Sequence, residues 1–261
     1  MTDVVVRGVR HHVQRLGAVV SGQRAVVFVH GLVMDNLSSF YFTLANPLAA
    51  HHAVMLYDLR GHGMSERPAI GYDVASLVDD LGALLDAQQL GLVTLVGNSF
   101  GGLVALATAL ARPRQVERLV LIDAHDGTAG WADKMAATLS LTGADRDATI
   151  ATSFAAWLGR HSERKRTKLQ RTAEALIEGT SLIADLRASP PLRDAELATI
   201  TCPVLALYGE RSDVRDRGEA LARLLPRCTL ELLPGCSHSV LWEATNAVRD
   251  RIVAELAREA P

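Results

Sequence analysis

Short runs of apolar residues alternate with longer stretches of helical periodicity along this chain. Four such runs occupy residues 25–30, 53–58, 93–97 and 118–123, and polar side chains rarely interrupt them. Uninterrupted apolar runs are typical of strands whose two faces are both buried. We therefore expect central, parallel strands at these positions, in an α/β fold with a mostly parallel sheet and helices on both faces.

Helices are expected between these strands, because parallel strands need right-handed crossover connections. The first helical segments cover residues 38–50, 72–90 and 100–112, and Pro113 ends the last of them. Strands and helices return late in the chain, with strands at 203–208 and 229–233 and helices near 217–225 and 241–258.

The stretch from residue 124 to residue 200 breaks this pattern. It contains no strand-like run and ends in the turn-forming sequence Ser189-Pro190-Pro191. We expect residues 124–200 to form a helical cap, inserted into an α/β core domain made of residues 1–123 and 201–261.

Three apolar side chains of this cap are candidates for substrate contact. Trp131, Met135 and Trp157 can pack against the core or line a substrate pocket.

Composition indicates a folded, globular protein. Of the 261 residues, 49% are hydrophobic and 21% are charged, and the formal net charge is −2. The absence of net positive charge argues against a nucleic-acid partner. No apolar segment is long enough for a membrane span or an export signal. The three cysteines have no C-x-x-C spacing, which favours free thiols in the cytoplasm and implies neither a metal nor a cofactor.

The strongest chemical signal is Gly97-Asn98-Ser99-Phe100-Gly101-Gly102, between an expected strand and an expected helix. A G-x-S-x-G sequence in that context is typical of a nucleophile elbow, which presents a serine hydroxyl to the substrate. Glycines are needed because a Cβ would collide across so tight a turn. The Phe100 N–H and the positive end of the helix can then stabilise negative charge beside Ser99. A simple helix cap at Ser99 is the structural alternative.

Serine becomes a good nucleophile only when a base removes its proton. His238 follows the last expected strand and precedes the final helix, which suits this role. Other histidines fit less well: His30 and His62 sit in turn motifs, and four more lie in segments that look like edge or surface sequence, namely His11, His12, His51 and His52.

A carboxylate must orient the imidazole of such a base. Asp213 follows the strand at 203–208 and gives the chain order Ser, Asp, His. Glu210 in the same loop and Asp123 at the end of another strand are alternatives. We favour Asp213, because a carboxylate deeper in the loop better reaches Nδ1, and the predicted catalytic triad is Ser99, Asp213 and His238.

Four motifs occur in a fixed order along nearly the whole chain: His30-Gly31, the segment from Asp58 to Ser65, the elbow, and Gly209 to Asp213 followed by His238. Together they resemble the α/β-hydrolase superfamily, and in particular its serine esterases and thioesterases. The resemblance implies that Leu32, after the His-Gly pair, lends its N–H to an oxyanion hole together with Phe100.

These features predict hydrolysis of a carboxylic ester or thioester of a small to medium acyl substrate through an acyl-enzyme. Asn98 in the elbow resembles carbon–carbon bond hydrolases that cleave vinylogous diketones. The segment from Leu32 to Ser38 departs from their Gly- and Ser-rich pattern. Acyl transfer or cyclisation by the same triad is a further alternative, and a ligand receptor on the same fold is the non-enzymatic one.

A run of basic residues within the expected cap suggests a partner. Residues 160–171 hold six basic residues and one acidic residue. Such a run can attract an acidic partner such as an acyl carrier protein. It is equally typical of a solvated helix face.

Overall fold

The computed structural model describes residues 2–18, 24–143, 145 and 162–258. Within these residues one sheet runs through the molecule, with the strand order β1-β2-β4-β3-β5-β6-β7-β8. Strand β2 pairs antiparallel with β1 and β4, and all other neighbours are parallel. The strands are β1 (Thr2–Val6), β2 (Val9–Leu16), β3 (Ala25–Val29), β4 (Ala53–Tyr57), β5 (Val93–Asn98), β6 (Val116–Ile122), β7 (Val204–Gly209) and β8 (Cys228–Leu233).

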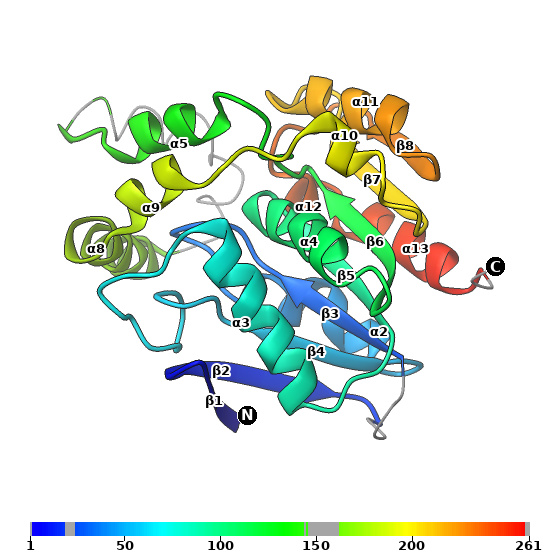
Figure 1. Cartoon of the computed structure of the whole chain (residues 1–261), viewed down its shortest axis with the longest axis horizontal. Coiled ribbons are helices and arrows are strands. Elements are labelled where there is room, and N and C mark those ends of the chain that lie inside the picture. The colour runs from blue at the N-terminus through cyan, green and yellow to red at the C-terminus, as the bar shows by residue number, and fades with distance from the viewer. Residues whose placement is uncertain (1, 19–23, 144, 146–161, 259–261) are drawn as a thin grey trace.

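Helices cover both faces of the sheet (Figure 1). One face carries α3 (Val74–Ala87), α4 (Phe100–Ala111) and α11 (Arg215–Leu224). The other face carries α1 (Ser38–Phe40), η1 (Tyr41–Ala45), α2 (Asn46–Leu48), α12 (Val240–Glu243) and α13 (Thr245–Leu256). No helix in the described ranges is long and apolar enough to cross a membrane.

Side chains of the central strands alternate between two core layers. Val27 and Val29 of β3 belong to the layer under α3 and α4, whereas Val26 and Phe28 belong to the opposite layer. Each of these four residues is at most 2% exposed. Burial on both faces explains why the parallel strands read as uninterrupted apolar runs.

The carboxyl ends of three neighbouring strands are aligned. Asn98 of β5 pairs with Ile122 of β6, and Ile122 pairs with Leu207 of β7. The residues that follow these strands therefore emerge side by side at one edge of the sheet, where parallel α/β proteins bind their ligands.

The α/β fold class and the six strands expected from the sequence are confirmed. The antiparallel pair β1 and β2 is not among those expected strands, because β2 interrupts its apolar residues with histidines. His11 and His12 lie in the edge pair of the sheet, in keeping with the edge interpretation, but they are not at the surface, since they are 0% and 5% exposed. The Asp58 carbonyl lies 3.2 Å from His11 Nδ1, and the Asp3 carboxylate lies 3.2 Å from His12 Nδ1, so both rings are buried with partners.

The chain between β6 and β7 is helical where the structure describes it. It contains α5 (Trp131–Leu139), α8 (Glu163–Gly179), α9 (Leu182–Ala188) and α10 (Asp194–Leu197). Helix α9 packs on both α5 and α8, and α10 contacts α4. Asp185 of α9 accepts hydrogen bonds from the N–H groups of Gly71 and Tyr72 at 3.0 and 2.7 Å, which ties the insertion to the loop before α3. The division at residues 124 and 200 into cap and core stays a prediction.

A buried charge network joins the β1–β2 edge to α3. Asp80 is 1% exposed, and Arg60 donates to both of its carboxylate oxygens at 2.6 and 2.7 Å. Arg7 Nε and His11 Nε2 lie 3.5 and 3.4 Å from the same carboxylate. Because an unpaired buried charge is costly, Arg60 depends on Asp80 for its place in the interior.

We expect Asp80→Asn to lower the free energy of unfolding by about 3 kcal/mol, because the buried Arg60 guanidinium loses its counter-charge. Urea unfolding followed by circular dichroism measures this change. Asp86→Asn is the matched control, since Asp86 forms a comparable pair with Arg112 at the surface, with two hydrogen bonds of 2.8 Å. Loss of that exposed pair should cost less than about 1 kcal/mol. Equal destabilisation by the two substitutions would contradict the expectation.

Candidate active site

The elbow of the sequence forms a sharp turn between β5 and α4. Ser99 has a φ of 53° and a ψ of −118°, a conformation that residues with a side chain rarely adopt. A Cβ on Gly97 would lie 2.5 Å from the Gly101 carbonyl oxygen, and a Cβ on Gly101 would overlap the Val29 carbonyl. Strand and helix can therefore converge only with glycine at both positions, and Ser99 lies at the apex.

His238 lies on the loop between β8 and α12, and it meets Ser99 there. Its Nε2 is 2.9 Å from Ser99 Oγ. Glu243 of α12 holds the loop, because its carboxylate accepts hydrogen bonds from the Ser237 N–H at 2.6 Å and the Ser237 hydroxyl at 2.9 Å. The structure thus brings together the two residues that the sequence predicts as nucleophile and base.

The carboxylate that pairs with His238 is Asp123, which corrects the expectation of Asp213. Asp123 Oδ2 lies 2.6 Å from His238 Nδ1, whereas Asp213 Oδ1 lies 3.9 Å away. The Asp123 side chain is 0% exposed and that of Asp213 is 68% exposed. Glu210, the other alternative, accepts a hydrogen bond from the Gly235 N–H at 2.9 Å and so anchors the histidine loop.

The arrangement of neighbouring strand ends explains why Asp123, and not Asp213, pairs with His238. Asp123 follows β6 directly and faces the end of the adjacent strand β7, where its Oδ1 accepts a hydrogen bond from the Gly209 N–H at 2.7 Å. The Ser212 hydroxyl donates to Asp123 Oδ2. Ser212 thus fills the inward position of the loop after β7, and Asp213, one residue later, lies exposed. The φ of 44° at Asp123 is one that aspartate tolerates better than most residues.

The electrostatic surroundings of His238 favour a functional base. Burial alone would lower the pKa of its imidazole, but the hydrogen bond and charge of Asp123, together with the charge of Asp213, outweigh that effect and raise the pKa. A base whose pKa lies close to the working pH transfers protons most effectively. Asp213 therefore contributes negative charge without a hydrogen bond to the ring.

The two N–H groups expected to form an oxyanion hole are free in the described part of the chain. Neither the Leu32 N–H nor that of Phe100, which begins α4, donates a hydrogen bond there. The N–H groups on either side of Leu32 do donate. The Gly31 N–H donates to the Asp35 carboxylate at 2.7 Å, and the Val33 N–H donates to His62 Nε2 at 2.8 Å. Free donors beside a serine are what an oxyanion hole requires, and the role of these two stays a prediction.

Two buried histidines support the loop that carries Leu32. His62 Nε2 accepts a hydrogen bond, so its Nδ1 carries the proton and donates to the Arg60 carbonyl at 2.8 Å. Burial beside His30 lowers the pKa of His62 to about 3, which keeps this ring neutral. His30 Nε2 in turn accepts from the Leu59 N–H at 3.0 Å. These rings hold backbone segments together and lie in the scaffold of the site.

Trp131 of α5 lies over the elbow. Its indole stacks on the Phe100 ring, with centroids 5.7 Å apart and an interplanar angle of 12°. The ring of His125 lies 5.5 Å from Trp131 and 5.5 Å from His238. His125 belongs to none of the motifs recognised in the sequence. Its place just after a parallel strand, where site residues of α/β proteins gather, is the signal that points to it.

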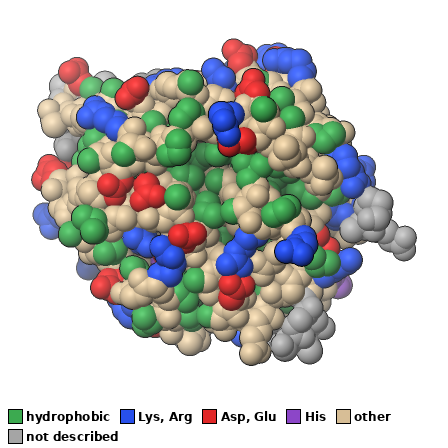
Figure 2. All heavy atoms as spheres, viewed as in Figure 1, with side chains coloured by type: hydrophobic (Ala, Val, Ile, Leu, Met, Phe, Trp, Pro, Cys, Tyr) green, Lys and Arg blue, Asp and Glu red, His purple; other side chains and the backbone are tan. Residues whose placement is uncertain are grey.

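Met135 and Trp157 are the other two cap side chains that the sequence offers for substrate contact. Met135 packs on the core from α5, and Trp157 lies outside the described residues. Among the residues that the structure describes, no group of His, Cys, Asp and Glu could hold a metal ion. Hydrophobic side chains gather where the middle of one face is hollowed, with charged side chains around them (Figure 2).

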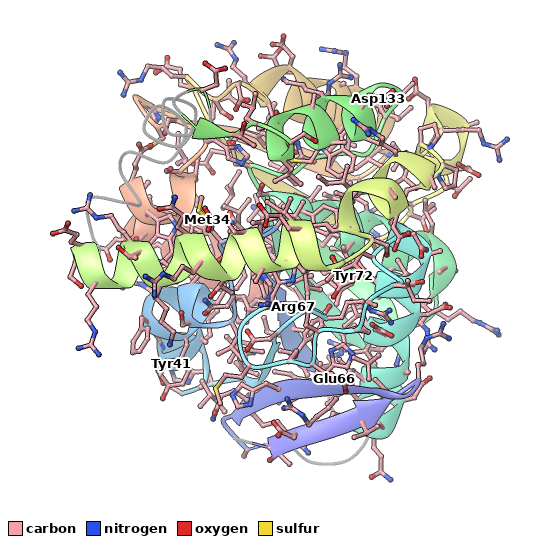
Figure 3. The ribbon with its side chains drawn as sticks, turned by 90° about the vertical axis from the view of Figure 1, so that its left-hand side faces the viewer. Met34, Tyr41, Glu66, Arg67, Tyr72 and Asp133 are labelled. Carbon is pink, nitrogen blue, oxygen red and sulfur yellow. The ribbon has the colours of Figure 1, made fainter. Side chains whose placement is uncertain are left out.

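The basic run lies largely on the exposed side of α8. Arg164, Lys168 and Arg171 of this helix, together with Arg67, line a groove of about 730 Å³. Figure 3 shows Arg67 directly beneath the long helix that crosses the front of the molecule. Docking of an acyl carrier protein or another acidic partner in this groove stays a prediction.

Comparisons with known proteins agree with this fold. The model of the alpha/beta hydrolase family matches residues 26–251. The chain is 43% identical over 101 residues to 2-hydroxy-6-oxo-2,4-heptadienoate hydrolase of Pseudomonas putida, covering 38% of this chain and 37% of that protein. It is 27% identical over 277 residues to the putative carbamate hydrolase RutD of Caulobacter sp., covering 100% of both. The enol-lactonase of Burkholderia xenovorans has a TM-score of 0.79 and 22% identity, covering 98% of this chain and 100% of that one.

A mostly parallel sheet with a strand-to-helix elbow, together with these relatives, defines a hydrolase of the α/β fold. The chain belongs to the α/β-hydrolase family, whose model spans most of its length.

Proposed function

We propose that this protein hydrolyses a carboxylic ester or thioester of a small to medium acyl group through an acyl-enzyme on Ser99. The observation that carries the proposal is the continuous hydrogen-bonded series from Ser99 Oγ through His238 to Asp123, with distances of 2.9 and 2.6 Å. A hydroxyl bonded to an imidazole, which is in turn oriented by a buried carboxylate, is the arrangement that activates serine.

The proposed reaction uses this series in two half-reactions. Ser99 Oγ attacks the carbonyl carbon while His238 Nε2 takes the hydroxyl proton, and the N–H groups of Leu32 and Phe100 bind the resulting oxyanion. The tetrahedral intermediate then expels the alcohol or thiol, which receives the proton from His238. A water molecule, deprotonated by the same imidazole, attacks the acyl-enzyme and releases the acid. Asp123 stabilises the imidazolium that forms in each half-reaction.

Labelling with a fluorophosphonate tests the proposal before any natural substrate is known. We expect intact-protein mass spectrometry to show a single adduct on the wild-type chain, because the probe reacts with an activated serine. Ser99→Ala removes the nucleophile and His238→Ala removes the base, so both variants should stay unlabelled. Circular dichroism of the variants shows whether they are folded. A folded wild type that stays unlabelled would overturn the proposal and favour a ligand receptor on the same fold.

Carbon–carbon bond hydrolysis is the second candidate, and two observations favour it. Asn98 lies within the elbow. A Cβ built on Gly31 would lie 3.7 Å from Asn98 Nδ2, so the Asn98 amide lies close to the loop that carries Leu32. A stretch of 101 residues is 43% identical to its counterpart in 2-hydroxy-6-oxo-2,4-heptadienoate hydrolase, an enzyme named for a hydroxy-oxo-dienoate substrate. Turnover of a vinylogous diketone in preference to p-nitrophenyl esters and acyl thioesters would select this alternative.

The compartment and the fate of the acyl group are further parts of the proposal. The three cysteines are free thiols, which suits the reducing cytoplasm. If an alcohol or amine replaced water in the second half-reaction, the same residues would carry out acyl transfer or cyclisation. Product analysis by mass spectrometry with added nucleophiles distinguishes these outcomes from hydrolysis.

A further inference from the structure

Two polar rings beside the proposed triad, those of Trp131 and His125, make no hydrogen bond among the described residues. The indole Nε1 of Trp131 is buried without a hydrogen-bond acceptor among the described residues. The ring of His125, described above as a neighbour of Trp131 and His238, also makes no hydrogen bond within the described chain. A buried donor without an acceptor costs free energy unless a ligand supplies the acceptor.

The backbone holds His125 and Trp131 close to the nucleophile. The His125 N–H donates to the carbonyl of Ser99 at 3.1 Å, so this residue is attached to the elbow itself. Trp131 stacks on Phe100, the residue that follows Ser99. An acyl group bonded to Ser99 Oγ would therefore lie beside these two rings after the leaving group has departed.

The charge state of His125 suits a hydrogen-bonding role. Burial and the nearby charges of His238 and Lys134 lower the pKa of His125 to about 3, so its ring is neutral at physiological pH. A neutral imidazole offers one N–H donor and one acceptor nitrogen. It also leaves His238 free to accept a proton, whereas a second imidazolium 5.5 Å away would oppose that proton electrostatically.

We propose that Trp131 and His125 form a recognition site for a second oxygen atom in the acyl group, and that the preferred substrates are oxo-acyl esters or thioesters rather than plain alkanoyl ones. The Trp131 Nε1–H and one nitrogen of His125 bind this oxygen, while Ser99 attacks the scissile carbonyl. The inference rests on the proposed function, because it assigns the acyl side of the same site. A polar site of this kind rejects an analogue that lacks the oxygen, because the site's donors then stay unpaired.

Matched ester pairs test this assignment. We compare p-nitrophenyl 4-oxopentanoate with p-nitrophenyl pentanoate, and the 5-oxohexanoate with the hexanoate, so that chain length is constant within each pair. For each pair, the ratio of kcat/KM for the oxo ester to that for the alkyl ester is divided by the ratio of their rates of alkaline hydrolysis. This division corrects for the different intrinsic reactivity of the two esters. We expect the wild-type enzyme to prefer the oxo ester of at least one pair by about tenfold, the effect of a single well-formed hydrogen bond.

Two variants separate recognition from packing. Trp131→Phe keeps an aromatic ring against Phe100 but removes the N–H donor, and His125→Phe keeps a ring but removes both nitrogens. Each should reduce the oxo preference by about threefold to tenfold, because kcat/KM falls more for the oxo ester than for the alkyl ester of the same length. Fluorophosphonate labelling of both variants should stay stoichiometric, because neither belongs to the proposed triad.

The outcomes distinguish this inference from the proposed function on which it rests. If the wild type is labelled but shows no normalised oxo preference in either pair, the inference fails and the proposed function stands. Equal loss of activity toward oxo and alkyl esters in both variants would indicate a packing role and would also overturn the inference. Absence of labelling in the folded wild type overturns the proposed function, and the inference fails with it.

Discussion

Replacement of Asp123 by asparagine should lower kcat about 10⁴-fold, while the same replacement at Asp213 should lower it less than about threefold. The amide introduced beside His238 would present an N–H₂ donor to Nδ1 and favour the tautomer that carries its proton on Nε2. That tautomer cannot accept the proton of Ser99. Asp213 makes no such hydrogen bond, since its carboxylate lies 3.9 Å from Nδ1 and is mostly exposed. Steady-state kinetics with p-nitrophenyl butyrate measure both effects.

The pH dependence of kcat/KM provides a second readout for these variants. The proposed base His238 can accept a proton only when its ring is neutral, so activity should rise with pH through its pKa, which lies above the ordinary value of 6.5. Both aspartates raise that pKa through their negative charge. Asp213→Asn should therefore move the acidic limb of the profile to lower pH, with its plateau almost unchanged. A large fall of the plateau in Asp213→Asn, with Asp123→Asn nearly active, would reverse the assignment.

Replacement of Gly101 by alanine should destabilise the protein by about 3 kcal/mol and abolish fluorophosphonate labelling. The new Cβ would overlap the backbone of β3, because the carbonyl of Val29 and that of His30 occupy its position. The backbone in the centre of a sheet cannot move aside, whereas the end of a flexible side chain can. Helix α4 would have to move away from β3, and Ser99, which directly precedes that helix, would move with it.

Gly179→Ala is the matched control for this substitution. Gly179 ends α8, and a Cβ built there meets no atom within 4 Å. Urea unfolding should show a change of less than about 0.5 kcal/mol for this variant, and its labelling should equal that of the wild type. Normal stability and labelling of Gly101→Ala would show that the elbow tolerates a side chain at this position.

The parallel part of the sheet was predictable because its strands are buried on both faces, so that residues such as Val26 and Val27 must both be apolar. The edge pair β1 and β2 escaped prediction for the opposite reason. Its buried histidines depend on partners elsewhere in the chain, such as the Asp58 carbonyl 3.2 Å from His11, and no local pattern records such a contact. The same limitation applies to His125, whose ring lies 5.5 Å from that of His238 in a distant segment of the chain.

By itself, the sequence determined the α/β class and indicated Ser99 and His238 as nucleophile and base. The glycines around Ser99 are required because a Cβ would collide with residues only a few positions away in the turn, and His238 follows a recognisable strand. Only the tertiary structure decided which carboxylate orients His238. Asp123 and Asp213 each follow a strand, and these strands are neighbours, so chain order cannot distinguish them. The choice depends on which side chain faces inward where β6 and β7 end, and Ser212 occupies the inward position that would otherwise admit Asp213.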